Sequence, residues 1–184
     1  MVAEKLPLKY NGKWGNANIN KGCDENGQGS PFSIYMYGAF MAEVNVNTKT
    51  GKATVEGFTA MADVGKINNK LVVDGQMYGG IAQGIGLALS EDFEDIEKHS
   101  TMLGAGIPYA RDITDKFDIV YFENARVNGP FGAAGVGELP LTSPHVAVIN
   151  AIKNATGVRI THLPARPEKV LAGLKELEAK KVHA

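Results

Sequence analysis

The sequence predicts a mixed α+β fold, of the α/β type in which helices pack on a mixed sheet. Alternating apolar and polar residues, followed by a turn and a second apolar segment, predict a β-hairpin near the start of the regular part of the chain. Helical spacing of apolar residues recurs in three later segments, and a short strand lies between the first two of them. The order hairpin, helix, strand, helix, helix defines this class.

The hairpin is predicted from a period of two residues. In the first strand Phe40, Ala42, Val44 and Val46 alternate with Met41, Glu43 and Asn45. Residues 47–51 have the composition of a turn, and residues 53–58 read as the returning strand.

A glycine-rich helix is predicted over residues 74–93. Its apolar positions Met77, Ile81, Ile85 and Leu89 have helical spacing, yet the segment contains Gly75, Gly79, Gly80, Gly84 and Gly86. Each glycine inside a helix costs about 1 kcal/mol relative to alanine, so something must compensate for several of them. Either another element packs closely against the helix, or a ligand approaches its backbone.

The rest of the chain predicts one strand and two helices. Residues 118–122 form the strand. Ser143 and Pro144 are suited to the N-cap and first position of a helix that ends at Gly157. The last helix opens near Pro167, and its two closing lysines at 180–181 suit the helix dipole.

Composition excludes several functions. With 184 residues, 19 Lys+Arg and 20 Asp+Glu, the net charge of -1 leaves no global field to attract nucleic acid or an anionic membrane. The apolar-leaning stretch at 75–90 is too short to span a bilayer, and residues 1–7 contain no secretory signal, so we expect a cytoplasmic protein. One Cys cannot build an iron–sulfur cluster, and the four histidines show no local metal-ligand spacing, so no metal ligand is predicted in this chain.

The candidate chemistry lies in a glycine-rich loop at 129–141 with one carboxylate, Glu138. The loop matches neither a phosphate loop nor a dinucleotide fingerprint. It suits a glutamate held for proton abstraction, or a solvated glutamate in a turn. Gln76 and Gln83 share one face of the predicted helix, where they either bind a polar ligand or hydrogen-bond a neighbouring loop. Asp63-Val64-Gly65 is typical of a strand end and a turn, with a ligand contact as the alternative.

Three segments together resemble a known family. The segments are Asp63-Val64-Gly65-Lys66-Ile67-Asn68, the glycine- and glutamine-rich run from Asp74 to Glu91, and Gly135-Val136-Gly137-Glu138-Leu139-Pro140-Leu141. In this order they resemble the molybdenum hydroxylases of the xanthine oxidase and aldehyde oxidoreductase group, and most of all the bacterial aldehyde oxidoreductases. The resemblance extends from about Pro7 to Lys180 and includes the closing run at 163–171.

The resemblance implies roles for four residues. Glu138 matches the general base that takes a proton from the oxygen attacking the substrate carbon. Gln76 matches a glutamine that hydrogen-bonds the molybdopterin cofactor, while Gln83 is a weaker match, and Gly137 is expected at the cofactor beside Glu138. Iron–sulfur clusters are expected only in other domains or in a partner chain.

The resemblance also implies a larger enzyme, a homodimer acting on small aldehydes or related substrates. Residues 1–33 are then an irregular lead-in continuing an upstream domain, and residues 34–184 the C-terminal molybdopterin-binding domain. The family commonly has Asn-Pro where this sequence has Asn68-Asn69, which changes a turn. The remaining domains are the expected partners, and we expect the chain alone to be inactive. The alternative is a non-catalytic binding or assembly module that retains the fold without cofactor.

Overall fold

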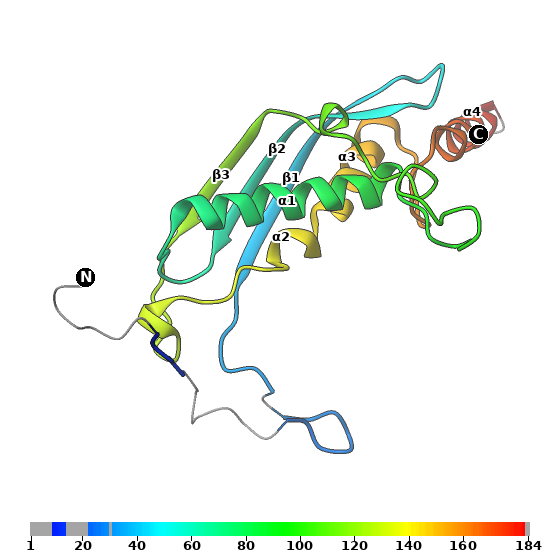
Figure 1. Cartoon of the computed structure of the whole chain (residues 1–184). Coiled ribbons are helices and arrows are strands. Elements are labelled where there is room, and N and C mark those ends of the chain that lie inside the picture. Colours follow the sequence, from blue (N-terminus) through cyan, green and yellow to red (C-terminus); the bar gives the residue numbers. More distant parts are fainter. Residues whose placement is uncertain (1–8, 14–21, 30, 183–184) are drawn as a thin grey trace.

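The architecture is a three-stranded sheet with helices packed on one face (Figure 1). The computed structural model describes residues 9–13, 22–29 and 31–182. The strands are β1 (Tyr37–Val46), β2 (Ala53–Asp63) and β3 (Phe117–Phe122), in that order across the sheet. The predicted α+β class is confirmed.

The predicted hairpin is confirmed, and its second strand is longer than expected. β1 pairs antiparallel with β2, from Tyr37 opposite Asp63 to Val46 opposite Ala53. In the turn, the side chain of Asn47 accepts hydrogen bonds from the backbone N–H groups of Lys49 and Thr50, at 2.9 and 3.1 Å. β2 continues to Asp63 because it has a hydrogen-bonded strand on each side.

β3 runs parallel to β2, with Phe58 opposite Phe117 and Asp63 opposite Phe122. Parallel neighbours need a crossover connection, and here the crossover contains the glycine-rich helix. The carboxyl ends of β2 and β3 therefore lie side by side at one edge of the sheet. The segments that leave these two strands begin next to each other.

The three predicted helices form, and a short helix that was not predicted, α2, precedes the second of them. They are α1 (Lys70–Leu89), α2 (Leu139–Thr142), α3 (Pro144–Thr156) and α4 (Pro167–Val182); the 3₁₀ turns are η2 (Ala110–Asp112) and η3 (Pro130–Gly132). α1 begins four residues before the predicted start because the Asn69 side chain caps it, accepting from the Val72 N–H at 3.2 Å. It ends at Leu89 rather than Phe93.

The predicted boundaries of α3 are confirmed at both ends, with Pro144 as its first residue. Gly157 ends the helix in the left-handed conformation, with φ +80°. Ser143 occupies the N-cap position, but its side chain accepts no capping hydrogen bond. The prediction that Ser143 caps the helix is therefore wrong for the side chain.

The core lies between the sheet and helices α1 and α3, and α1 crosses the strands in Figure 1. The members contributed by α1 and α3 are Met77, Ile81, Ile85, Ala88, Val148 and Ile152. The opposite face of the sheet exposes apolar side chains from all three strands, among them Tyr37, Met41, Met61, Val120 and Phe122.

The described part of the predicted lead-in has little regular structure. Residues 22–29 contain one isolated bridge between Cys23 and Gly29, and residues 31–33 lie in no helix or strand. Residues 1–8, 14–21 and 30 lie outside the described part, so the boundary at 33 stays a prediction. Among the helices the structure describes, none combines the length and hydrophobicity needed to cross a bilayer.

Candidate functional site

The site is built where β2 and β3 end. From β3 the chain runs through a loop at 123–138 and into α2, while from β2 it turns into α1. An isolated bridge between Gly65 and Ala133 joins the two outgoing segments. The topology thus brings together the glycine-rich loop and the glycine-rich helix, the two sequence motifs with candidate chemistry.

The structure brings Gln76 to the residue before Glu138. Nε2 of Gln76 donates a hydrogen bond to the carbonyl oxygen of Gly137 at 3.3 Å. Gln76, Gly137 and Glu138 are all exposed. Gln76 therefore bonds a neighbouring loop, as the structural alternative predicted, and this bond brings its amide to the residue that precedes Glu138.

The part of α1 that carries Gln76 is tied to the sheet through Asp74. The Tyr121 hydroxyl of β3 donates to Oδ1 of Asp74 at 2.7 Å, and Nζ of Lys70 lies 2.7 Å from Oδ2. The hydrogen bonds from Lys70 and then Tyr121 hold the pKa of Asp74 below its usual value. Burial, followed by the bond to the Asp74 carboxylate, raises the pKa of Tyr121. Asp74 therefore stays ionised and binds both neighbours at neutral pH.

The backbone on the other side of Glu138 is held by packing. Glu138 is the N-cap residue of α2, and its carbonyl accepts from the Leu141 N–H at 3.0 Å. The next two residues, Leu139 and Pro140, are buried. Glu138 thus presents an exposed carboxylate on a backbone whose following turn is fixed in the core.

The glycines of α1 serve two purposes. A Cβ at Gly80 would lie 2.6 Å from Cγ of Pro140, and one at Gly84 would lie 2.7 Å from Cβ of Pro144. These two glycines let α2 and the start of α3 approach the helix. By contrast, a Cβ at Gly75 or Gly79 would meet nothing within 4 Å. One side of α1 therefore needs glycine for packing, and the other presents bare backbone to open space.

Gln83 lies two turns beyond Gln76 on α1, and it is exposed. Its side chain forms no hydrogen bond with any residue that the structure describes. The structure therefore links Gln76, but not Gln83, to the loop that carries Glu138.

The described loop also contains a residue that the sequence analysis missed, Arg126. Its Nη2 lies 2.9 Å from Oδ1 of Asp63, at the end of β2, and its Nε donates to the Tyr35 carbonyl at 3.1 Å. No local spacing identifies this arginine, because its partners Asp63 and Tyr35 are distant from it in the sequence. Asp63 therefore has a structural partner in place of the ligand contact considered above.

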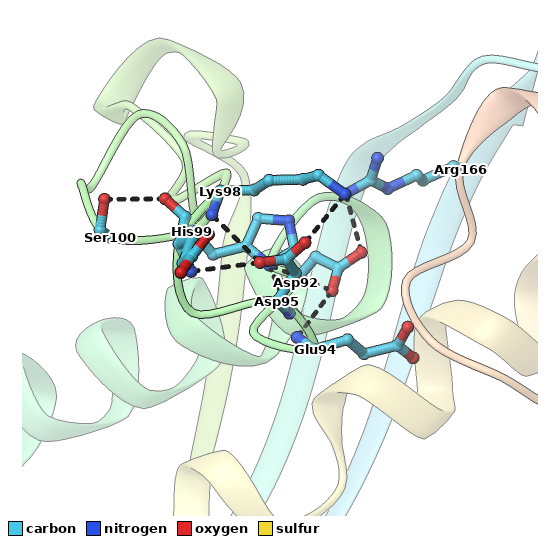
Figure 2. Close-up of polar contacts among 8 residues, drawn as sticks. Asp92, Glu94, Asp95, Lys98, His99, Ser100 and Arg166 are labelled. Atoms are coloured by element: carbon cyan, nitrogen blue, oxygen red, sulfur yellow. Dashed lines mark hydrogen bonds and ion pairs between the residues drawn. The ribbon is translucent and has the colours of Figure 1, made fainter.

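A second polar cluster lies elsewhere, around Asp92 (Figure 2). Nη2 of Arg166 lies 2.9 Å from Oδ2 of Asp92, and Nδ1 of His99 lies 3.7 Å from Oδ1. The ion pair between Asp92 and Arg166 connects the segment after α1 with the residue before α4. Within the described ranges, no three His, Cys, Asp or Glu side chains are grouped to hold a metal ion.

The residues at the loop and α1 fit an uncharged, hydrogen-bonding ring system better than a directly ligated metal. Gln76 and Gln83 offer amide donors and acceptors, and Gly75 and Gly79 leave backbone uncovered beside them. Glu138 adds a single exposed carboxylate. A pterin presents ring nitrogens and a carbonyl that such amides can bind, so this donor set suits a molybdopterin.

Comparison with known families identifies the kind of domain. Residues 1–114 match the family model described as the molybdopterin cofactor-binding domain. The chain belongs to this family of molybdopterin cofactor-binding domains. The relatives of this chain include aldehyde oxidoreductases and a probable hypoxanthine oxidase.

Individual relatives of this molybdopterin-binding domain are much longer. The chain is 63% identical to the aldehyde oxidoreductase of Megalodesulfovibrio gigas over 176 residues, which are 95% of this chain and 19% of that protein. It is 34% identical to the probable hypoxanthine oxidase XdhD of Escherichia coli, over 80% of this chain and 16% of that protein. The chain thus spans about a fifth of the length of these relatives.

A solved structure shows the same fold. The aldehyde oxidoreductase of Desulfovibrio desulfuricans superimposes with a TM-score of 0.84 and 63% identity, over 94% of this chain and 19% of that one. The predicted fold family is confirmed. The assigned roles of Glu138, Gln76, Gln83 and Gly137 remain proposals.

Proposed function

We propose that this chain is the C-terminal cofactor-binding segment of a molybdenum-dependent oxidoreductase that hydroxylates aldehydes, or related substrates, with water. The observation that carries the proposal is the hydrogen bond from Gln76 to Gly137, which places an amide beside the residue that precedes Glu138. The two motifs, one on α1 and the other in the loop after β3, are exposed at the same edge of the sheet.

When bound, the molybdenum cofactor supplies the two-electron oxidation of the substrate. Glu138 acts as the general base: a carboxylate oxygen accepts a proton from the oxygen nucleophile as that oxygen attacks the substrate carbon. An ionised carboxylate is needed for this step, and the exposed side chain of Glu138 has no hydrogen-bond partner among the described residues that would occupy it. The exposure of Glu138 also leaves room for a substrate.

Gln76 holds the cofactor through its amide. Gln83, two turns further along α1, supports the residues that contact the cofactor and does not contact it itself. Nε2 of Gln76 already bonds Gly137, so its Oε1 is the atom that can accept from a pterin N–H. Gly137 has space in place of a side chain, since a Cβ there would approach only Nε2 of Gln76, at 4.0 Å. The remaining domains of the enzyme, a homodimer in this proposal, supply the other contacts.

The test is Glu138→Gln in the complete enzyme that contains this chain. We expect turnover to fall by at least about 10²-fold, the usual scale for losing a positioned general base, while molybdenum content stays unchanged. Steady-state kinetics and metal analysis measure the two quantities.

Glu94→Gln is the matched control, because Glu94 is exposed and belongs to the separate cluster of Figure 2. We expect this variant to retain full turnover. Unchanged turnover in Glu138→Gln would remove Glu138 from the mechanism and contradict the proposed function.

A further inference from the structure

Arg126 lies within the loop that carries Glu138 and joins this loop to the end of β2 and to the segment before β1. Besides Asp63 and the Tyr35 carbonyl, its guanidinium bonds the Asn124 carbonyl and lies 5.5 Å from the centroid of the Tyr37 ring. The side chains of Arg126 and Asp63 are 16% and 13% exposed. An ion pair so shielded from water is held more firmly than one on the open surface.

Asp63 is saturated with donors. Nδ2 of Asn124 donates to Oδ2 at 2.8 Å, and the Gly65 N–H donates to Oδ1 at 3.1 Å, beside Arg126. Burial by itself raises the pKa of Asp63, but the hydrogen bonds from Asn124 and Gly65, with Arg126, outweigh it and hold the pKa below its usual value. The carboxylate therefore stays charged throughout the neutral range.

The backbone follows the same connection. The N–H groups of Arg126 and Lys66 both donate to the Gly132 carbonyl, each at 2.9 Å, and the Ala134 N–H donates to the Val64 carbonyl at 2.8 Å. Gly65 permits this approach: its φ is +71°, and a Cβ there would lie 2.5 Å from the Gly132 oxygen. The loop is thus laid along the chain that leaves β2.

The loop is anchored on both sides of Glu138. The first anchor is the set of contacts between the loop and the end of β2, and the second is the buried turn that follows Glu138. Three residues separate Ala134 from Glu138, and the turn after Glu138 is buried through Leu139 and Pro140. The second anchor depends on α1 and the core, whereas the first depends on Asp63 and Arg126. Loosening the first anchor would therefore shift the loop without unpacking α1.

We infer that Asp63 and Arg126 are a positioning pair. They hold the loop at 123–138 so that the Glu138 carboxylate, beside Gln76, is placed to accept the proton. This inference rests on the proposed function of Glu138. Neither residue of the pair touches the reacting atoms. Their effect passes through the loop backbone, so it should appear in turnover more than in substrate or cofactor binding.

The first measurement uses Arg126→Lys and Asp63→Asn in the complete enzyme. Lysine keeps the charge but cannot bond Asp63, Tyr35 and Asn124 at once, and asparagine keeps the shape but loses the charge. We expect kcat to fall by about 10²-fold, the scale reported for a 1 Å misplacement, with KM and molybdenum content within about twofold of the wild type.

The second measurement adds Arg126→Lys to Glu138→Gln. Because the pair acts through the Glu138 carboxylate, we expect the added change to lower kcat by less than about threefold. An added loss as large as in the wild-type background would contradict the inference, since the pair would then act independently of Glu138.

The third measurement needs no activity. In this chain, hydrogen exchange at the amides of Lys66, Arg126 and Ala134 should be at least about tenfold faster in Arg126→Lys, while Met77 and Ile81 in α1 are unchanged. Arg166→Lys is the matched control, because it disrupts a pair of the same 2.9 Å length with Asp92 in the cluster of Figure 2. We expect it to alter neither the three amides nor kcat.

The outcomes separate this inference from the proposed function. If Glu138→Gln leaves turnover unchanged, the proposed function fails. If Glu138→Gln lowers turnover but Arg126→Lys and Asp63→Asn do not, only the positioning pair is overturned. Loss of molybdenum in both pair variants would also overturn it, because the pair would then maintain the domain rather than position the carboxylate.

Discussion

Glu91 is a carboxylate buried in the interior just after α1, with 7% of its surface exposed. A Cβ on Gly86 would collide with Oε1 of Glu91, so this glycine makes room for the acid. Burial raises the pKa of Glu91. The folded protein therefore favours the protonated form more than the unfolded chain does.

The sign of the pH effect follows from linkage. A raised pKa in the folded state contributes stability that is fully present below the unfolded value, about 4.3, and is lost as the pH rises through the folded pKa. We expect Glu91→Gln to stabilise the chain relative to wild type at pH 7 and to have a smaller effect at pH 4. Urea unfolding of both proteins at the two pH values measures this difference.

Glu94→Gln serves again as the control, since this neighbouring glutamate is exposed. Its free energy of unfolding should differ little from that of the wild type at either pH. If the stabilisation by Glu91→Gln is the same at pH 4 and pH 7, ionisation of Glu91 is not its cause.

α1 is the element that serves both the core and the site. Its buried side includes Met77 and Ile81, and on that side Gly80 lies against Pro140, two residues after Glu138. Its open side carries Gln76 and Gly79. The same glycine-to-alanine change should therefore have opposite effects at two consecutive positions.

Gly79→Ala should stabilise the chain by about 0.5–1 kcal/mol, because alanine has the higher helix propensity and its Cβ meets open space. Gly80→Ala should destabilise it by about 1–3 kcal/mol, because its Cβ would collide with Pro140. Chemical denaturation of the two variants checks both values. Effects of equal sign would show that α2 does not pack on α1 as described.

At the scale of the whole molecule, the candidate site is open on one side. Gln76, Gln83, Gly137 and Glu138 are all exposed, and a Cβ on Gly137 would approach only the Gln76 side chain. The relatives that match this chain are about five times its length. We infer that the other wall of the site comes from further parts of the enzyme.

We therefore predict that the purified chain neither retains molybdopterin nor oxidises aldehydes. A site assembled from several segments loses affinity steeply when most of them are missing, since each charge-assisted hydrogen bond contributes roughly 1.5–3 kcal/mol. Elemental analysis for molybdenum and an aldehyde oxidation assay test this expectation. Stoichiometric molybdenum in the chain would overturn it, and so would aldehyde turnover.

Sequence patterns predicted the elements whose signals are local. The alternation from Phe40 to Val46 identified β1, and the helical spacing from Met77 to Leu89 identified α1. Boundaries were less certain where a cap decided them: Asn69 starts α1, although Asn68-Asn69 read only as a turn. A capping side chain acts through one hydrogen bond, which periodicity does not record.

The candidate site was only partly predictable for the same reason. Gln76 and Glu138 lie in segments of distinctive composition, so the sequence alone could identify them as candidate site residues. Arg126 stands in a segment without such a signal, and its importance comes from Asp63 and Tyr35, which are distant in the chain. Pattern reasoning could also not tell Gly80 from Gly79, because the difference is whether Pro140 lies opposite.

The sequence by itself determined the fold class, the family resemblance and the two motifs that carry the candidate chemistry, because periodicity, glycine content and motif order are properties of the chain alone. Only the tertiary structure decided that Gln76 meets the loop of Glu138 and that Asp63 and Arg126 hold that loop. The physical reason is the parallel pairing of β2 and β3, which places their carboxyl ends at one edge of the sheet.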